Sequence, residues 1–214
     1  MPDTGRAALT DLRAQPKSRY TAGMLLVCGI DEAGRGPIAG PVTAAVVAFL
    51  DGVIPAGLRD SKQLSPDRRA ELEGLLRAGA CFGLGWCWPA EIDSLNIHRA
   101  TLVAMERAYR AFARRLSPAA GRRAQTLALV DGRFCPPLPI PTRAVVGGDR
   151  TIPQIQAASI LAKTARDRFM TSYAQLDPRY GFDRHKGYPT AAHCRALHTA
   201  GRCFLHRRSF NGVP

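Results

Sequence analysis

Residues 24–50 read MLLVCGIDEAGRGPIAGPVTAAVVAFL, which is two apolar runs separated by a glycine-rich turn. Apolar runs of this length, bounded by turn residues, predict two buried β-strands. The first run ends in two adjacent carboxylates, Asp31 and Glu32, and a glycine–arginine–glycine turn follows almost at once. A functional interpretation has to explain this acidic pair, because the chain as a whole is strongly basic.

The rest of the chain alternates between strand and helix patterns. A capped helix is predicted at 65–79, with Ser65 as its N-cap, Pro66 in its first turn and Gly79 at its end. Other segments have the periodicity of strands (80–88, 126–132 and 142–149) or of helices (96–116, 152–176 and roughly 190–200). Strands mixed with helices in this way indicate an α/β fold.

Composition divides the chain into three regions. Residues 1–23 are polar and arginine-rich without steady periodicity, which predicts a flexible leader. Residues 24–178 carry the strands and the long helices, and we expect them to form one α/β domain. Residues 179–214 are basic, aromatic and turn-rich, and we expect a helical and loop extension packed on that domain.

The charge balance points to a polyanion as the partner. The 214 residues include 30 Lys and Arg against 17 Asp and Glu, which gives a formal charge of +13 and a pI near 10.3. Such an excess is typical of nucleic-acid binding, with a merely soluble basic surface as the alternative. No apolar run approaches the roughly 20 residues of a membrane helix, so no membrane association is expected.

The six cysteines indicate neither a metal site nor a disulfide framework. None forms a C-x-x-C pair, and Cys28 lies in an apolar strand pattern that predicts a buried thiol. The histidines include no H-E-x-x-H pattern, so zinc is not expected. Because no secretory leader is visible, we expect a cytoplasmic protein with reduced thiols, and we expect a monomer.

Three apolar strands each end in a carboxylate: Asp31, Asp131 and Asp149. If these strands are neighbours in one sheet, the three acids converge at one edge, where like charges repel unless a cation lies between them. The cation is either an arginine or a divalent ion such as Mg²⁺ or Mn²⁺. Two such ions about 3.5–4 Å apart catalyse in-line phosphodiester cleavage. The alternative is that each aspartate simply caps a turn.

The turn after the acids has its own significance. In a regular strand Asp31 and Glu32 face opposite sides, so both can join one site only if the strand ends or twists there. The glycines at 34 and 36 permit such a change and leave N–H groups accessible to a substrate. An ordinary tight turn is the alternative. A dinucleotide-binding fingerprint is excluded, because no third glycine follows at the required spacing.

Seven motifs in order resemble the ribonuclease HII family, the type 2 ribonucleases H. They are GIDEAGRGPIAGPVTAAVV, DSKQLSP, EIDSLNIHRATLVAM, LVDG, AASILAKTARD, YGFDRHKGYPT and HRRSF, and together they span roughly residues 24–210. The resemblance implies a ribonuclease-H-like mixed sheet flanked by helices, with a C-terminal helical extension. It also implies cleavage of RNA in RNA–DNA hybrids and at ribonucleotides embedded in DNA, with Mg²⁺ or Mn²⁺.

Roles carry over from the family residue by residue. The acidic quartet that would hold two ions resembles Asp31, Glu32, Asp131 and Asp149. The reader of the ribose 2′-hydroxyl resembles Gly34, Arg35 and Gly36, and Tyr188 matches the tyrosine that packs on the sugar at the RNA–DNA junction. Ser61 and Lys62 match a phosphate-contacting pair. Lys186 and His185 lie in a basic loop, where a phosphate contact and plain solvation are both open.

The chain departs from the family pattern at two places. Gly147 stands where a lysine is usual, which puts that lysine's phosphate contact in doubt. The stretch before HRRSF reads GRCF instead of a proline-containing turn, and we expect this to alter the local tail geometry and not the chemistry.

Several other polar or aromatic residues have plainer interpretations. Asp167 is expected to pair with Lys163 four residues earlier on a helix. Glu91 and Asp93 are expected to favour a helix N-terminus, and the two tryptophans at 86 and 88 to pack at the core or edge. The basic residues of the extension are expected to contact phosphates: Arg184, His185, Lys186, Arg195, Arg202, Arg207 and Arg208.

The expected mechanism needs no nucleophilic side chain. One ion would lower the pKa of a bound water and the other would stabilise the departing 3′-oxygen. Two rival classes stay open: another metal nuclease or phosphoryl-transfer enzyme on a similar fold, and a binding module that grips hybrid duplexes without cutting them. The second is disfavoured because all four acids are present.

Overall fold

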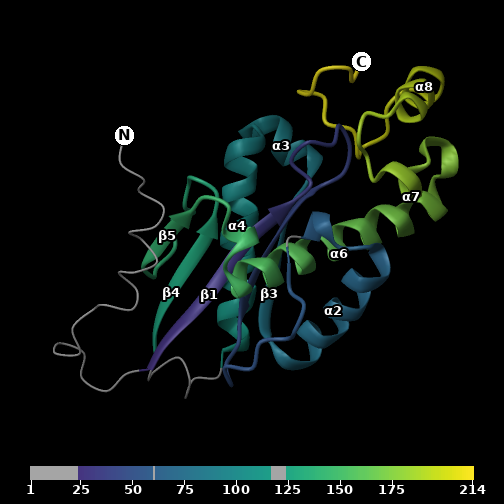
Figure 1. The fold of residues 1–214 in the computed structure, drawn as a ribbon. Coiled ribbons are helices and arrows are strands. Elements are labelled where there is room, and N and C mark those ends of the chain that lie inside the picture. The colour runs from purple at the N-terminus through teal and green to yellow at the C-terminus, as the bar shows by residue number, and fades with distance from the viewer. Residues whose placement is uncertain (1–23, 60, 117–123) are drawn as a thin grey trace, which may run out of the picture.

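A computed structural model describes residues 24–59, 61–116 and 124–214, and the side chains at positions 24, 62 and 124 also lie outside that description. The leader predicted at 1–23 therefore falls outside the described residues. The predicted α/β architecture is confirmed as a mixed sheet with helices on both faces (Figure 1).

The sheet has five strands in the order β3-β2-β1-β4-β5. Strands β1, β2 and β3 form antiparallel pairs, whereas β4 and β5 join β1 in parallel. Their bounds are Met24–Ala33 for β1, Val42–Ala48 for β2, Cys81–Cys87 for β3, Ala124–Asp131 for β4 and Thr142–Val145 for β5. All five strands predicted from the sequence are therefore present, and β1 is the central one.

The predicted helices are also present. They are α2, Pro66–Gly79; α4, Ile97–Arg115; α6, Pro153–Leu176; and α8, Ala191–Ala200. Ser65 caps α2 as predicted, because its hydroxyl accepts from the N–H of Arg68 at 3.2 Å. The sequence patterns missed short pieces: α3, Pro89–Leu95; α7, Phe182–His185; and the 3-10 turns η1, Ser61–Gln63, η2, Gly148–Arg150, and η3, Pro178–Tyr180.

Helices cover the two faces of the sheet. Helix α4 packs on one face through Ala104, Ala108 and Phe112, against side chains of β1 and β2 such as Cys28. Helices α2 and α6 pack on the other face and enclose a second cluster. Cys28 is fully buried, as predicted, and burial raises the pKa of its thiol to about 12.

Helix α6 lies directly on the central strand. A Cβ atom at Gly29 would overlap the backbone of Gln154 and Ile155, so only glycine permits this approach. The contact fixes the first turns of α6 beside the end of β1. As a result, Ser159 lies within hydrogen-bonding reach of Asp31.

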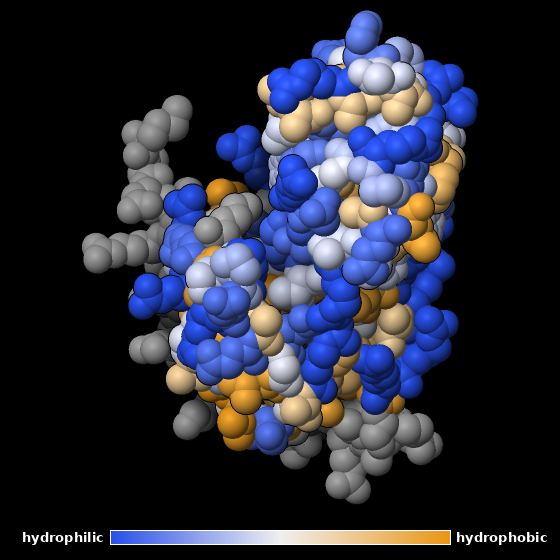
Figure 2. Space-filling model, turned by 90° about the vertical axis from the view of Figure 1, so that its right-hand side faces the viewer, coloured by the Kyte–Doolittle hydropathy of each residue, from blue (hydrophilic) through white to orange (hydrophobic). Residues whose placement is uncertain are grey.

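The C-terminal residues pack on the far half of α6. Helix α7 lies beside that end of α6 (Figure 1). A third buried cluster joins Met170 and Ala174 of α6 with Tyr180, Phe182 and Leu205. The surface over α7, α8 and α2 is predominantly hydrophilic, with small hydrophobic groups between (Figure 2). Among the described helices, none combines the length and apolar character that a membrane span requires.

Candidate active site

Three of the predicted acidic residues come together at one edge of the sheet. Asp31 lies near the end of β1, and Asp131 is the last residue of β4, the parallel neighbour of β1. The two lie close enough for the Asp131 charge to raise the pKa of Asp31. The backbone N–H of Asp149 donates to Asp131 Oδ1 at 3.4 Å. These contacts agree with the convergence predicted from the strand ends.

Asp149 does not end a strand, contrary to the sequence prediction. β5 stops at Val145, and Asp149 is the middle residue of η2. Gly147, just before η2, has φ 69°, a left-handed conformation that costs other residues roughly 1–2 kcal/mol. A lysine at 147 would carry that cost, which gives a physical reason for glycine here.

Asp31 is held in an interior environment. The residue is 5% exposed, and burial, followed by the charges of Glu32 and Asp131, holds the pKa of its carboxyl well above the usual range. The N–H of Glu32 donates to Asp31 Oδ1 at 2.7 Å, and the Ser159 hydroxyl also donates to this carboxyl. Ser159 Oγ lies 2.8 Å from Ser61 Oγ, so both serines help to orient Asp31.

Glu32 leaves the strand on the other side. The pairing of β1 with β2 stays regular through Ala33, so the strand neither ends nor bulges at the acidic pair. The two side chains therefore start from opposite faces of β1. The Glu32 charge nevertheless raises the pKa of Asp31, so the longer Glu32 side chain keeps its carboxylate close to that of Asp31. Glu32 Oε1 lies 3.3 Å from Arg35 Nη1, so the turn that follows the strand supplies a cation to this carboxylate.

The donor set fits a hard divalent cation. Within the described part of the chain, neither Asp31 nor Asp131 forms an ion pair, so arginine does not neutralise them. Among the described residues, no three Asp, Glu, His or Cys side chains are already grouped closely enough to bind one metal ion. Mg²⁺ usually takes one or two carboxylates and completes its shell with water and phosphate oxygens. Two close carboxylates, of which Asp31 has a raised pKa, suit that type of site.

The glycine–arginine–glycine turn lies next to Tyr188. Gly34 has φ 91°, and a Cβ there would overlap Nε and Cδ of Arg166. Arg35 and Gly36 are exposed, and a Cβ at Gly36 would lie 3.5 Å from Tyr188 Cε1. Tyr188 is 44% exposed. The structure thus brings together two motifs that are about 150 residues apart in the sequence.

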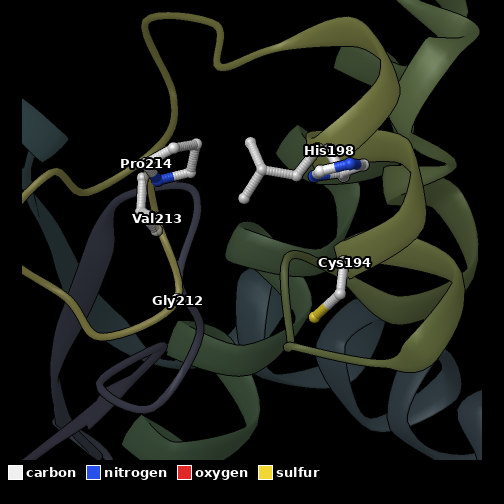
Figure 3. A pocket seen from close by; sticks show the side chains of 6 residues that line it. Cys194, His198, Gly212, Val213 and Pro214 are labelled. Carbon is white, nitrogen blue, oxygen red and sulfur yellow. The ribbon is translucent and has the colours of Figure 1, made fainter.

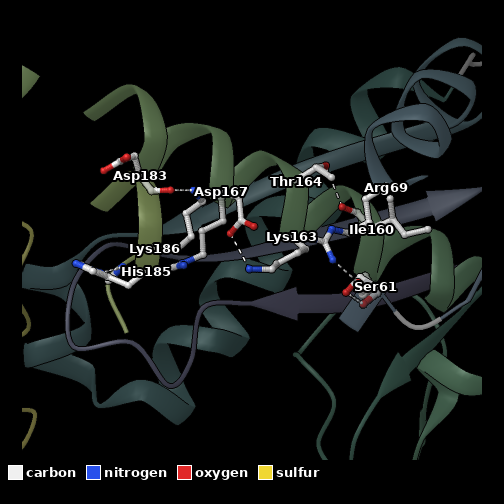
Figure 4. Close-up of polar contacts among 12 residues, drawn as sticks. Ser61, Arg69, Ile160, Lys163, Thr164, Asp167, Asp183, His185 and Lys186 are labelled. Carbon is white, nitrogen blue, oxygen red and sulfur yellow. Dashed lines mark hydrogen bonds and ion pairs between the residues drawn. The ribbon is translucent and has the colours of Figure 1, made fainter. Parts of the chain in front are cut away.

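The predicted phosphate contacts have different surroundings. The Ser61 hydroxyl faces inward to Ser159, so a phosphate contact from this residue would have to use its backbone N–H. The side chain of Lys62 lies outside the described residues. Lys186 closes α7 with φ 53°, and its Nζ donates to the carbonyl of Asp183 (Figure 4). These roles stay predictions.

The plainer interpretations have mixed outcomes. Lys163 pairs with Asp167 at 2.7 Å, as predicted (Figure 4). Glu91 accepts from the N–H of Trp88 and so caps α3, a helix that the sequence patterns missed, instead of the long helix α4 whose start it was expected to favour. The prediction for Asp93 was wrong, because its carboxylate accepts from the N–H groups of Arg208 and Ser209 and so ties down the C-terminal segment.

The aromatic prediction is confirmed as well. Trp86 and Trp88 stack on each other with ring centroids 6.2 Å apart, and Phe169 of α6 meets both rings edge-on. The pair therefore packs the edge strand β3 against α6.

Comparison with known proteins gives the family. The sequence profile described as Ribonuclease HII matches residues 28–213. The chain belongs to the ribonuclease HII family. Ribonuclease HII of Maricaulis maris is 52% identical over 189 residues, which cover 87% of this chain and 82% of that protein.

Solved structures show the same fold. Ribonuclease H2 of Pyrococcus horikoshii superposes with a TM-score of 0.65 at 24% identity, covering 88% of this chain and 95% of that one. Bst-RNase HIII in complex with Mn²⁺ gives a TM-score of 0.66 at 15% identity, covering 93% and 72%. The ribonuclease HII family cleaves RNA in RNA–DNA hybrids, and this chain is a ribonuclease H.

Sequence reasoning missed two buried arginines among the residues that the structure describes. Arg166 of α6 is 1% exposed and donates to the carbonyls of Ala39 and Pro41. Arg207 is fully buried, so its predicted phosphate contact is wrong. Nothing in the local sequence distinguishes it from Arg208 beside it, which is exposed. Only the packing of the C-terminal segment turns one side chain inward and the other outward.

One pocket lies away from these residues. It has a volume of about 360 Å³ and opens between α8 and the end of the chain (Figure 3). Its lining residues are Cys194, Leu197, His198, Gly212, Val213 and Pro214. None of them belongs to the predicted acidic site or to the turn that follows β1.

Proposed function

We propose that this ribonuclease HII is a metal-dependent endonuclease that cuts duplex DNA on the 5′ side of an embedded ribonucleotide. It would leave a 3′-hydroxyl on one side and a 5′-phosphate on the ribonucleotide, and would also cut RNA within longer RNA–DNA hybrids. Such an activity serves to remove ribonucleotides and RNA primers from DNA. The supporting observation is that Tyr188 lies beside Gly36, at the turn that directly follows Asp31 and Glu32.

The acidic residues would hold the metal. We assign Asp31, Glu32, Asp131 and Asp149 as ligands, directly or through water. Two divalent ions, Mg²⁺ or Mn²⁺, would supply an activated water and stabilise the departing 3′-oxygen. The structurally similar Bst-RNase HIII was solved in complex with Mn²⁺, which supports this cofactor. Ser159 and the N–H of Glu32 orient the Asp31 carboxyl, and burial keeps competing solvent from it.

Recognition would rest on the turn and on the basic surface. The exposed N–H groups of Arg35 and Gly36 suit the ribose 2′-hydroxyl, which is the group that distinguishes RNA from DNA. The Tyr188 ring suits the adjoining sugar. Phosphates of the duplex would be held by Lys62, Lys186 and the exposed arginines of a surface that is largely hydrophilic (Figure 2).

We also propose a division of the described chain into a catalytic domain that ends near residue 178 and an extension from 179 onward. The hydrophobic cluster that joins α6 to Phe182 and Leu205 supports packing of one on the other. A monomeric, cytoplasmic protein is proposed too, and the six cysteines are free thiols, as that location requires.

A cleavage assay tests the proposal. The substrate is a duplex with one ribonucleotide, compared with a continuous RNA–DNA hybrid and with all-DNA duplex, each with Mg²⁺, with Mn²⁺ and with chelator. We expect a metal-dependent cut 5′ of the lone ribonucleotide. Binding without cutting would favour the inactive binding module, and efficient cutting of all-DNA duplex would favour a different nuclease.

Tyr188→Ala separates the junction reader from the metal site. The substitution should impair cutting at a lone ribonucleotide more than within a long hybrid, because a run of ribose sugars offers alternative registers. Equal losses on both substrates would contradict the junction-reading role of Tyr188.

A further inference from the structure

The turn after β1 is hydrogen-bonded on its buried side to Arg207, near the C-terminal end of the chain. Arg207 donates from Nη2 to the carbonyl of Gly34 at 2.6 Å and from Nη1 to those of Arg35 and Pro37 at 3.0 and 2.6 Å. Its Nε donates to Gly40 at 2.9 Å. One guanidinium therefore donates hydrogen bonds to four carbonyls of the loop that contains the proposed 2′-hydroxyl reader.

Backbone hydrogen bonds continue the same contact. The N–H of Arg207 donates to the carbonyl of Ile38 at 2.9 Å, and the N–H of Gly40 donates to the carbonyl of Leu205 at 2.8 Å. Ala39 and His206 form an antiparallel bridge. The C-terminal segment thus acts as a short strand against the loop, and the Arg207 side chain fills the space below it.

This arrangement decides which way the loop's polar groups face. With the carbonyls of Gly34 and Arg35 turned inward, the N–H groups of Arg35 and Gly36 have no acceptor among the described residues. Both residues are exposed. A buried charge is tolerated only when it is fully hydrogen-bonded, and here carbonyl dipoles serve that purpose. The same bonds keep the outward N–H groups fixed before any substrate arrives.

The segment also reaches Tyr188. The N–H of Cys203 donates to His206 Nδ1 at 3.0 Å, so in neutral His206 the proton is on Nε2. This nitrogen lies 3.2 Å from His193 Nε2, and His193 Nδ1 lies 2.9 Å from the carbonyl of Tyr188. A chain of hydrogen bonds therefore runs from the segment to the second part of the reader.

We infer that residues 203–209, called the bracket segment, position both halves of the ribonucleotide reader, and that Arg207 is the main positioning residue. The inference rests on the proposed function. Arg207 touches neither substrate nor metal in this role. It fixes the loop so that a 2′-hydroxyl meets prearranged N–H groups, and loss of this order weakens discrimination between RNA and DNA sugars.

Equilibrium binding in Ca²⁺, a divalent ion offered in place of Mg²⁺ so that binding is measured without turnover, tests the inference. The measured quantity is the ratio of Kd for an all-DNA duplex to Kd for the same duplex with one ribonucleotide. Arg207→Met should reduce this ratio roughly tenfold, and Arg207→Lys should not restore it, because one ammonium group cannot serve four carbonyls. Arg179→Met is the matched control, since Arg179 is an exposed arginine of the same region, paired with Asp177.

Asp93→Ala provides a second route to the bracket segment. The half-buried Asp93 carboxylate accepts from the N–H groups of Arg208 and Ser209. Removing this carboxylate therefore loosens the segment without leaving a cavity in the core. We expect a smaller reduction of the ratio, about threefold, in a protein whose unfolding transition is intact. This variant decides the matter if Arg207→Met does not fold.

The outcomes separate the inference from the proposed function. If the unaltered protein binds both duplexes equally, the proposed reader is wrong. If the unaltered protein discriminates and folded Arg207→Met or Asp93→Ala discriminates equally well, the bracket role is overturned.

Discussion

Gly34→Ala should lower the stability of the protein, whereas Gly36→Ala should lower its cleavage activity, although the two glycines are only two residues apart. Gly34 has φ 91°, and a Cβ there would overlap Arg166 Nε and Cδ and lie 2.8 Å from the carbonyl of Pro41. Gly36 has an unremarkable φ, and its Cβ would meet only Tyr188 Cε1, at 3.5 Å. The first substitution therefore disturbs the interior, and the second changes only the surface that faces the substrate.

The magnitude for Gly34→Ala follows from two terms. A left-handed conformation costs an L-residue roughly 1–2 kcal/mol. Displacing Arg166 breaks its 2.8 Å hydrogen bond to Pro41, and a bond from a charged donor contributes about 1.5–3 kcal/mol. A loss of about 3 kcal/mol lowers Tm by roughly 10 °C in a chain of this size. Gly36→Ala should leave Tm within about 2 °C, since surface substitutions usually stay within roughly 0.5 kcal/mol.

Cleavage of a duplex with one ribonucleotide completes the comparison. Gly36→Ala should lower kcat/KM at least about tenfold while the protein stays folded, because the methyl group fills the space between the turn and Tyr188 that the sugar needs. Thermal unfolding and steady-state kinetics on the same samples provide both readouts. An unchanged Tm for Gly34→Ala would refute the steric argument, and normal turnover by Gly36→Ala would refute the placement of the reader.

Asp131→Asn should abolish cleavage but leave a folded protein that still binds hybrid, because the amide keeps the shape and removes the charge; near-normal turnover would remove Asp131 from the metal site. Burial lowers the pKa of His193 to about 4, so between pH 6.5 and pH 4 the unfolded chain takes up a proton that the folded chain does not. The free energy of unfolding should therefore fall by about 1.4 kcal/mol per pH unit on acidification from 6.5, as measured by denaturant titration, and this part of the slope should be missing in His193→Gln. Arg184→Gln and Arg195→Gln should each reduce the log–log salt slope of duplex binding by roughly 0.9 if the residue contacts a phosphate, and unchanged slopes would place the duplex elsewhere.

The local elements could be predicted because their signals are local. Strands β1 and β2 are continuous apolar runs, and α2 begins at Pro66 after a serine cap whose hydroxyl bonds the helix as expected. Helix α3 was missed because its seven residues are too few to show a helical period. The prediction for Asp149 failed in position for a related reason: the apolar pattern runs on past Val145, where pairing with β4 ends.

Three acids of the candidate site were also readable from sequence, because each follows or ends an apolar run. Their convergence, however, depends on strand order, and β4 pairs with β1 although about 90 residues separate them. Motif order indicated the family, and the resemblance assigned the loop and Tyr188 to one reader, a role that stays a prediction. Sequence could not show that residues of the C-terminal segment hydrogen-bond to this loop.

The bracket segment shows the difference between what the sequence determines and what only the tertiary structure decides. Sequence by itself determined a basic α/β ribonuclease HII chain with acids at strand ends and a glycine-rich turn, since hydrophobic periodicity, turn residues and motifs are written in neighbouring positions. Only the tertiary structure decided that Arg207 turns inward while Arg208 faces solvent, and that Asp93 holds the tail instead of capping a helix. The physical reason is that a charged side chain can be buried only where distant backbone carbonyls converge to accept its hydrogen bonds, and that convergence exists only in the folded chain.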